Sequence, residues 1–390
     1  MKFLFLDIKY PEKFISIMKY LSLNPECEIA FLINENEQKL NLGIENIKIY
    51  NYGIHCNMNL HHYLRTYYLA IMQGQAALEK LISMKKEGYV PDIIFANSWG
   101  NSMFIKNLFP DIPLISYFEW FYTIDNYFGS VNKKQTQNEM AIMQCWNTPL
   151  LHNLLSCDVG ICPTERQKQQ FPKEFQHKLN VIPDGIDTNF YKPNNNDGNA
   201  SEMQEKIVTF TINSMDLHSG FPQFMKMADK LQKKRTDVTF IVIDNYQTYF
   251  YSSIIKNYTY EKLLNEKYNI DKTRFFHLRC LSKQEYLEFL QMSSVHIYFT
   301  YPYTLSTSML EAMSTGCIVL GSKTAPVEEV IEDNKNGFLF DFNNVDEMLE
   351  KIEYIIDNQQ KLQDIRKNAR KTIIEKYDIN KTVSEIFNLL

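Results

Sequence analysis

Short apolar segments alternate with helix-like segments along nearly the whole chain, and no other feature of the sequence constrains the fold as strongly. In the first half, the pattern predicts strands at residues 2–7, 28–33, 47–50, 91–96, 113–118, 158–161 and 179–182. It predicts helices at residues 11–21, 60–87, 99–108, 139–155 and from 163 onward, the longest of them closed by Gly88. Strands separated by helices of this length are typical of a parallel sheet that is covered on both faces.

The polar segment 194–201, Asn-Asn-Asn-Asp-Gly-Asn-Ala-Ser, interrupts this pattern and is the obvious linker. The alternation then restarts, with strands predicted at residues 207–211, 238–243, 275–278, 295–299 and 318–320. We therefore expect two doubly wound α/β domains at residues 1–193 and 202–375, with the last helix, at about 376–390, a candidate for packing back on the first domain. Open parallel sheets bind ligands beyond the carboxyl ends of their strands, so a cleft between the domains is the expected site.

Size and composition support this organisation and exclude several classes of protein. A chain of 390 residues suits two domains of roughly 150–200 residues. The net charge of −5 comes from interspersed acids and bases, which argues against a nucleic-acid partner. The seven cysteines include no Cys-x-x-Cys pair, so neither a zinc site nor a disulfide framework is predicted. The apolar run at the start is too short for a signal peptide, and we expect a cytoplasmic protein.

The segment 298–321 carries the clearest candidate site. A strand leads through a loop into a helix that starts near Ser306, carries Glu311 about one turn in and stops at Gly316. The backbone N–H groups near Ser306 and Thr307 suit a phosphate, and the Glu311 carboxylate could accept hydrogen bonds from the two hydroxyls of a ribose. The simpler alternative is a helix capped by Ser306 or Thr307, with Glu311 exposed.

Several residues in this region resemble the donor-nucleotide segment of retaining family-four glycosyltransferases. They are Leu310-Glu311-Ala312-Met313, Gly316 and the segment 325–330, Ala-Pro-Val-Glu-Glu-Val. The resemblance implies a GT-B fold and places Glu311 at the second Glu of a Glu-x7-Glu motif, where it holds the ribose. The first Glu of the motif falls on Tyr303, an aromatic residue that one subgroup also carries. The resemblance further implies that the backbone around Arg279 and Leu281 flanks the base.

The segment 209–221 departs from the family pattern. Two basic residues that grip the donor diphosphate in relatives fall on Asn213 and Ser219. Each missing charge-assisted contact would be worth about 1.5–3 kcal/mol. His218, Lys323 or Arg279 could substitute for them, or be ordinary surface residues.

In the first domain, the segments 91–100 and 113–122 resemble one bacterial subgroup of the same family. Each is an apolar strand that ends in polar and aromatic residues, which places Asn97 and Glu119 at the expected cleft edge as acceptor-side, candidate catalytic residues. We expect Glu119 to be partly desolvated by its aromatic neighbours, or alternatively to be satisfied by a nearby helix. Lys9 or Lys13 could contact the donor or acceptor, but the simpler expectation for each is a solvated charge. The segment 183–187 is expected to be a hinge, so that Asp184 is a poor metal ligand.

The resemblance implies a retaining glycosyltransferase that moves a sugar from a nucleotide-diphosphate sugar to a hydroxyl of a bacterial glycan or a lipid-linked or protein-linked glycoconjugate. No Asp-x-Asp motif is present, so neither a metal nor another cofactor is expected. The alternative is a catalytically weak relative that acts as a glycan-binding or nucleotide-binding scaffold, suggested by the lost basic residues. Peripheral association with the inner face of a membrane, through residues 132–146, is left open.

Overall fold

The computed structural model describes residues 1–8, 11, 13–34, 42–44, 46–54, 59–123, 136–194, 206–212, 219–244, 268–279, 281–301 and 304–390. The chain divides into two compact units, Met1–Gly185 with Ile379–Leu390, and Ile186–Asp378. The first unit therefore ends at Gly185 and not at residue 193, because Ile186 and Tyr191 are buried in the core of the second unit. The last helix, α14 (Ile379–Phe387), belongs to the first unit.

Among the described residues, the first unit contains a seven-stranded parallel sheet in the order β3-β2-β1-β4-β5-β6-β7. Its strands are β1 (Lys2–Leu6), β2 (Glu28–Asn34), β3 (Ile47–Tyr52), β4 (Ile93–Asn97), β5 (Leu114–Tyr117), β6 (Val159–Cys162) and β7 (Leu179–Val181). All of them lie where the sequence pattern predicts strands.

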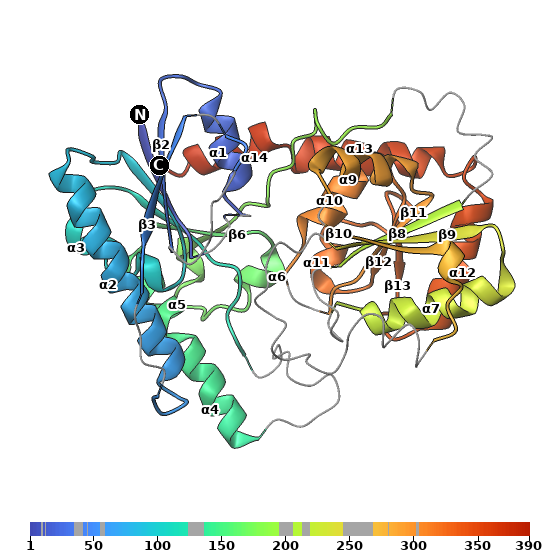
Figure 1. The fold of residues 1–390 in the computed structure, drawn as a ribbon, viewed down its shortest axis with the longest axis horizontal. Helices are drawn as coiled ribbons and strands as arrows, with labels where there is room; N and C mark the ends of the chain where they lie inside the picture. Colours follow the sequence, from blue (N-terminus) through green and yellow to red (C-terminus); the bar gives the residue numbers. More distant parts are fainter. Residues whose placement is uncertain are drawn as a thin grey trace. The chain divides into compact units, whose positions relative to one another are not determined.

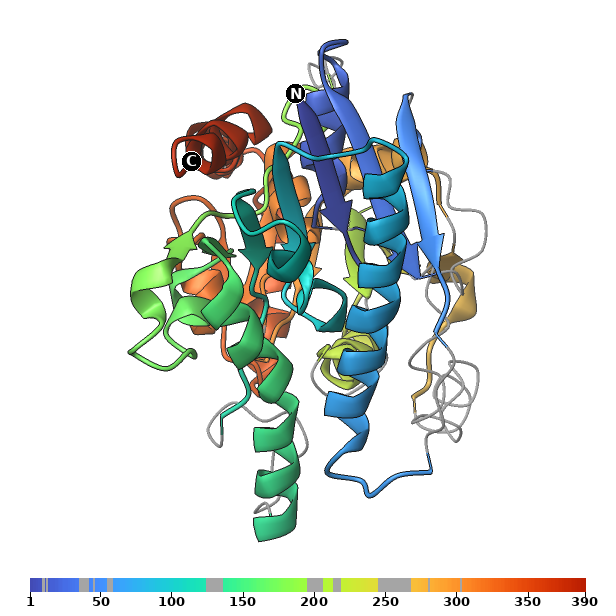
Figure 2. The same cartoon turned by 90° about the vertical axis from the view of Figure 1, so that its left-hand side faces the viewer.

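Helices cover both faces of this sheet because successive side chains of each strand point to opposite sides. Phe3 and Phe5 of β1 pack with α1 (Ile15–Ser22) and α14, which lie beside each other (Figure 1). Leu4 and Leu6 face the opposite side and pack with α2 (Arg65–Lys86), which lies along that face of the sheet (Figure 2). The other helices of the unit are η1 (Gly100–Ser102), α3 (Ile105–Leu108), α4 (Gln137–Trp146), α5 (Thr148–Ser156), α6 (Glu165–Lys168) and η3 (Gln176–Lys178).

Three predicted helices of the first unit differ from the structure. The helix predicted at 60–87 starts only at Arg65, and the one predicted at 99–108 is split into η1 and α3. The helix predicted at 139–155 is also two helices, because α4 ends at Trp146 and Pro149 sits in the first turn of α5. A proline has no N–H to continue the ladder of the preceding helix but fits the first turn of a new one.

The second unit contains a parallel sheet of six strands within the part of the chain that the structure describes, in the order β10-β9-β8-β11-β12-β13. Its strands are β8 (Lys206–Ile212), β9 (Val238–Asp244), β10 (Phe275–Arg279), β11 (Val295–Tyr298), β12 (Val319–Ser322) and β13 (Phe338–Phe340). Only β13 was not predicted from the sequence.

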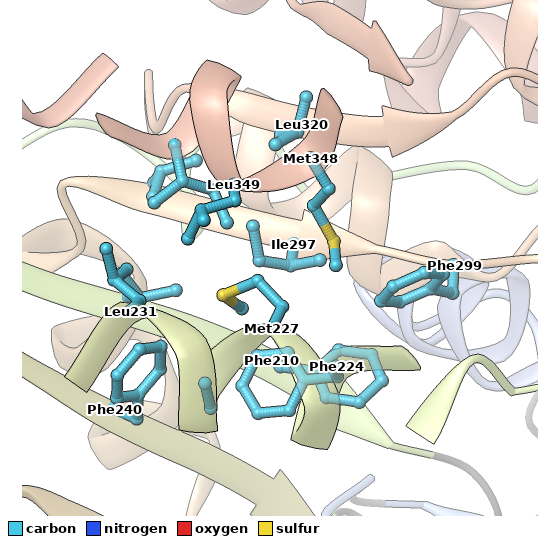
Figure 3. Packing of buried hydrophobic residues seen from close by; sticks show 14 of the residues in the cluster. Phe210, Phe224, Met227, Leu231, Phe240, Ile297, Phe299, Leu320, Met348 and Leu349 are labelled. Carbon is cyan, nitrogen blue, oxygen red and sulfur yellow. The ribbon is translucent and has the colours of Figure 1, made fainter. Parts of the chain in front are cut away.

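The helices of this unit also form two layers. Figure 3 shows part of the core between the sheet and α7 (Phe221–Lys234) with α12 (Val345–Asp357), which includes Phe210, Phe224 and Met348. On the other face lie α9 (Lys283–Met292), α10 (Thr307–Ser314) and α13 (Gln363–Lys376), with α11 (Ala325–Glu328) and η6 (Lys272–Arg274) as short connections. None of the helices in the described ranges is long and apolar enough to span a membrane.

Candidate functional site

The carboxyl ends of the second unit's strands form one edge, because every pairing in that sheet is parallel. Arg279 pairs with Asp244 at the ends of β10 and β9, and Tyr298 ends β11 beside Gly321 of β12. This is the edge at which doubly wound sheets bind their ligands. The helix α10 follows β11 and therefore begins at the same edge.

Ser306 is the N-cap residue of α10, and its side-chain oxygen accepts a hydrogen bond from the Ser308 backbone N–H at 3.4 Å. The Ser306 backbone N–H donates to the hydroxyl of Tyr298 at 2.8 Å. Thr307 is the first helical residue, and a backbone N–H at that position has no acceptor within its own helix. At the start of α10, the Ser306 N–H is therefore already hydrogen-bonded. The positive end of the helix dipole lies at the same place.

Glu311 lies on the partly buried side of α10 and is not the exposed residue of the simpler alternative. The hydroxyls of Tyr191 and Tyr286 lie near its carboxyl group. Burial raises the pKa of Glu311 above its ordinary value, while the charge of Lys283 and the two hydroxyls act in the opposite direction. A carboxylate in this setting can accept hydrogen bonds from a ligand that reaches its accessible side.

Arg279 and Leu281 lie just beyond β10. The Arg279 side chain is mostly exposed, with Nε 3.6 Å from Asp244 Oδ2, and Leu281 packs against the core next to α10. Lys323 follows β12 and is exposed, while its backbone N–H donates to Phe340 O at 2.7 Å. Arg279 and Lys323 therefore place cationic side chains at the same edge as α10.

Ser219 precedes α7, the helix that follows β8. Its hydroxyl oxygen accepts a weak hydrogen bond from Phe221 N at 3.4 Å. Gly220 has φ 71°, and an added Cβ would lie 2.1 Å from the ring of Phe299, so this turn requires glycine. The other residues of the predicted donor site, Asn213, His218 and Tyr303, lie outside the described residues, as does Lys9.

A second polar group lies at the corresponding edge of the first unit. Lys13 Nζ donates to Asp184 Oδ2 at 3.0 Å, and the Tyr117 hydroxyl donates to Asp184 Oδ1 at 2.9 Å. The Lys13 and Asp184 side chains are only 16% and 11% exposed, so the expectation of a solvated charge at Lys13 is wrong. Burial alone would lower the pKa of Lys13, but Asp184, Tyr117 and Glu119 raise it well above its usual range.

Glu119 lies beside Lys13, with its Oε1 3.8 Å from Lys13 Nζ. Its side chain is 38% exposed and therefore partly buried. The neighbouring Trp120 and Phe121 are themselves buried. Asn97 ends β4 and donates from Nδ2 to Asp7 Oδ1 at 3.5 Å, next to the end of β5.

The sequence indicated Glu311 but not the two tyrosines near it, and it indicated Glu119 but not the pairing of Lys13 with Asp184. These partners come from distant parts of the chain, and no local motif marks them. Across the described ranges, no group of three or more His, Cys, Asp or Glu side chains is arranged to hold a metal ion.

Two family models match consecutive parts of the chain. Residues 25–191 match the glycosyl transferase family 4 group, and residues 194–372 match glycosyl transferases group 1. HepE of Anabaena, solved in complex with UDP-glucose, superposes with a TM-score of 0.72 at 16% identity, over 100% of both chains. The fold is therefore GT-B, with two Rossmann-like α/β domains. The chain belongs to the group 1 glycosyltransferases.

Two curated relatives are similar to this chain over only part of its length. An uncharacterized glycosyltransferase of Haemophilus influenzae is 23% identical over 231 residues, which is 59% of this chain and 60% of the relative. The poly(ribitol-phosphate) alpha-N-acetylglucosaminyltransferase of Staphylococcus aureus is 34% identical over 84 residues, 21% of this chain and 17% of the relative. The aligned parts span less than two thirds of either relative's length.

Proposed function

We propose that this protein transfers a sugar, with retention of anomeric configuration, from a nucleoside-diphosphate sugar to a hydroxyl of a glycan or glycoconjugate. The observation that carries the proposal is the position of Glu311, partly buried one turn into a helix that begins at the ligand-binding edge of the second sheet. There the carboxylate binds the ribose hydroxyls, and the start of α10 near Thr307 faces the diphosphate.

The chemistry requires stabilisation of the departing diphosphate and of an oxocarbenium-like centre more than it requires a strong nucleophile. The positive end of α10 supplies part of this, and the cationic side chains of Arg279 and Lys323 supply the charge that relatives obtain from other basic residues. We propose that no metal ion takes part. The complex of HepE with UDP-glucose supports a uridine nucleotide sugar as the first donor to test.

On the first unit, we propose that Asn97 and Glu119 face the acceptor. Both follow strands at the carboxyl edge of the sheet, and Glu119 keeps an accessible carboxylate while Lys13 holds it on one side. The Staphylococcus aureus relative is named for transfer to poly(ribitol-phosphate), which supports a polymeric or glycoconjugate hydroxyl as the acceptor.

The test is release of nucleoside diphosphate from a panel of nucleotide sugars, with and without acceptor glycans. Glu311→Ala should abolish most of this turnover, whereas Glu350→Ala, an exposed glutamate on α12, should leave it unchanged. Turnover should also persist in EDTA. Equal activity of the Glu311 variant and the parent would remove Glu311 from the site.

One observation favours a second candidate, a nucleotide-binding scaffold with little turnover. Ser219 stands where relatives carry a basic residue, and its hydroxyl is engaged with Phe221 N. Tight binding of nucleotide sugars without release of product from any of them would support this second function.

A further inference from the structure

A mostly buried polar group lies beside Glu119 at the carboxyl edge of the first sheet. Lys13 Nζ donates to Asp184 Oδ2 at 3.0 Å, and the Tyr117 hydroxyl donates to Asp184 Oδ1 at 2.9 Å. Both oxygens of Asp184 therefore accept hydrogen bonds from residues of the first unit. The three side chains are anchored to one another before any ligand binds.

The Lys13 ammonium group lies between two carboxylates. Besides its hydrogen bond to Asp184, Nζ lies 3.8 Å from Glu119 Oε1. Nζ also lies 5.6 Å from the centroid of the Tyr117 ring, within the range of a cation–π contact. That ring is buried and packs edge to face on Phe14, with centroids 6.2 Å apart and planes at 81°. The position of the ammonium group is thus fixed from several sides.

Glu119 is the member of this group that a ligand can reach, since its side chain is more exposed than those of Lys13 and Asp184. Its main chain is anchored, because Glu119 O accepts from Gln167 Nε2 at 2.6 Å and the flanking Phe118 and Trp120 are buried. An ionised carboxylate only accepts hydrogen bonds. A group that binds there must therefore donate one, as the hydroxyl of a sugar does.

Lys13 itself is poorly placed to bind an anionic ligand, because its ammonium group is mostly buried and already paired with Asp184. Its contact with Glu119 is what connects the buried pair to an accessible side chain. We propose that Lys13 is a positioning residue that fixes Oε1 of Glu119 and directs the other carboxylate oxygen toward the acceptor hydroxyl. This inference rests on the proposed function, in which Glu119 faces the acceptor.

Positioning has a consequence that differs from stabilisation of the fold. A Glu119 side chain that is free to rotate must lose that freedom when the acceptor binds, and a misplaced acceptor hydroxyl reacts more slowly. Loss of the Lys13 charge should therefore impair use of the acceptor and leave nucleotide binding by the second unit unchanged.

The experiment uses the nucleotide sugar that the parent turns over, with UDP-glucose tested first. The acceptor probes are methyl glucoside, methyl N-acetylglucosaminide and ribitol phosphate. Lys13→Met is combined with Asp184→Asn, so that no buried carboxylate loses its cation. Lys13→Gln with Asp184→Asn is the second neutral pair, in which the two amides can still hydrogen-bond. Circular dichroism checks that both neutral pairs are folded.

Each neutral pair should raise the KM for the acceptor probe by about tenfold or more. The dissociation constant of UDP, measured by calorimetry, should not change. The matched control is Lys106→Met with Asp158→Asn, which removes another ion pair with a mostly buried lysine from the first unit, just before β6. This control should keep the acceptor KM of the parent.

A double-mutant cycle tests whether Lys13 acts through Glu119. Glu119→Gln should raise the acceptor KM by itself. In the Glu119→Gln background, the neutral pair at Lys13 and Asp184 should add little, because the carboxylate that Lys13 positions is gone. A purely structural role for the ion pair would multiply the two effects.

Failure of the inference differs from failure of the proposed function. If Glu119→Gln raises the acceptor KM but the neutral pairs do not, or if the two effects multiply, the positioning role of Lys13 is overturned and the acceptor role of Glu119 stands. If Glu119→Gln leaves the KM unchanged, or if the parent transfers sugar to none of the probes, then the acceptor role of Glu119 and the inference both fall.

Discussion

Lys13 and Asp184 lie 171 positions apart in the sequence and form an ion pair, with Nζ 3.0 Å from Oδ2. The pair connects the segment just before α1 to the segment that follows β7, and the Tyr117 hydroxyl donates to the second Asp184 oxygen. Lys13 Nζ also lies 5.6 Å from the centroid of the Tyr117 ring. Asp184 directly precedes Gly185, so this ion pair fixes the end of the first unit next to the point where the chain leaves it.

Removing one partner of this pair should destabilise the first unit. Lys13→Ala leaves the mostly buried Asp184 carboxylate without its cation, and we expect a loss of about 3–5 kcal/mol in the free energy of unfolding. Urea titration followed by tryptophan fluorescence measures this, because all three tryptophans, Trp99, Trp120 and Trp146, lie in the first unit.

The control is Lys48→Ala, which removes the cation of the more exposed pair with Glu28 and should change the midpoint little. The double variant of Lys13 and Asp184 should lose less than the sum of the two single losses. If the double variant lost the full sum of the two single losses in the free energy of unfolding, the two charges would not stabilise each other.

The second unit should lose stability in mild acid because of His296. This side chain is fully buried in β11, where Nδ1 lies 2.9 Å from Thr209 Oγ1, and burial lowers the pKa of His296 to about 3. In the unfolded chain the pKa of His296 is about 6.5. Above that pH the side chain is neutral in both states, and no stability is lost. As the pH falls from about 6.5 toward 3, unfolding takes up a proton, and about 1.4 kcal/mol is lost per pH unit.

Thermal unfolding followed by circular dichroism between pH 7 and pH 5 measures this loss. His296→Gln should flatten the dependence on pH, even where it lowers stability at neutral pH. His177→Gln changes an exposed histidine and is the matched control. Its stability should depend on pH as steeply as that of the parent. An unchanged slope in the His296 variant would assign the acid sensitivity to other groups.

The sequence predicted both sheets because each strand alternates with a helix and carries its own local signal. It also placed Glu311 in the first turns of α10 and the start of that helix near Ser306, since these depend on residues a few positions apart. Contacts between distant residues leave no such signal. The sequence therefore indicated a surface charge at Lys13, whereas in the structure Lys13 forms an ion pair with Asp184.

The same limit explains the rest of the site. Tyr191 and Tyr286 are ordinary tyrosines in the sequence, and only tertiary packing brings their rings together near Glu311. The sequence predicted a partly desolvated Glu119 from its aromatic neighbours, but no local motif indicated Lys13 beside it. In the structure, Trp120 and Phe121 are buried, and the Glu119 side chain stays 38% exposed.

A basic residue at position 219 should strengthen donor binding. Ser219 lies just before α7, whose positive dipole end already favours an anion, and an ammonium group there adds a charge-assisted contact to the diphosphate. We expect Ser219→Lys to lower the dissociation constant of a nucleoside diphosphate by about tenfold, measured by titration. Ser219→Met, of similar size without the charge, should show no gain, and weaker binding by the lysine variant would contradict a diphosphate at this position.

The central claim is that Glu311 binds the ribose of a nucleotide-sugar donor, and the most direct test is calorimetric titration of the parent and of Glu311→Ala with nucleoside diphosphates and their sugars. The account predicts that the parent binds at least one of them and that the variant binds it more weakly by about 1.5–3 kcal/mol, because charge-assisted ribose contacts are lost. Circular dichroism should show the variant folded. An unchanged dissociation constant in a folded Glu311→Ala variant would contradict the account.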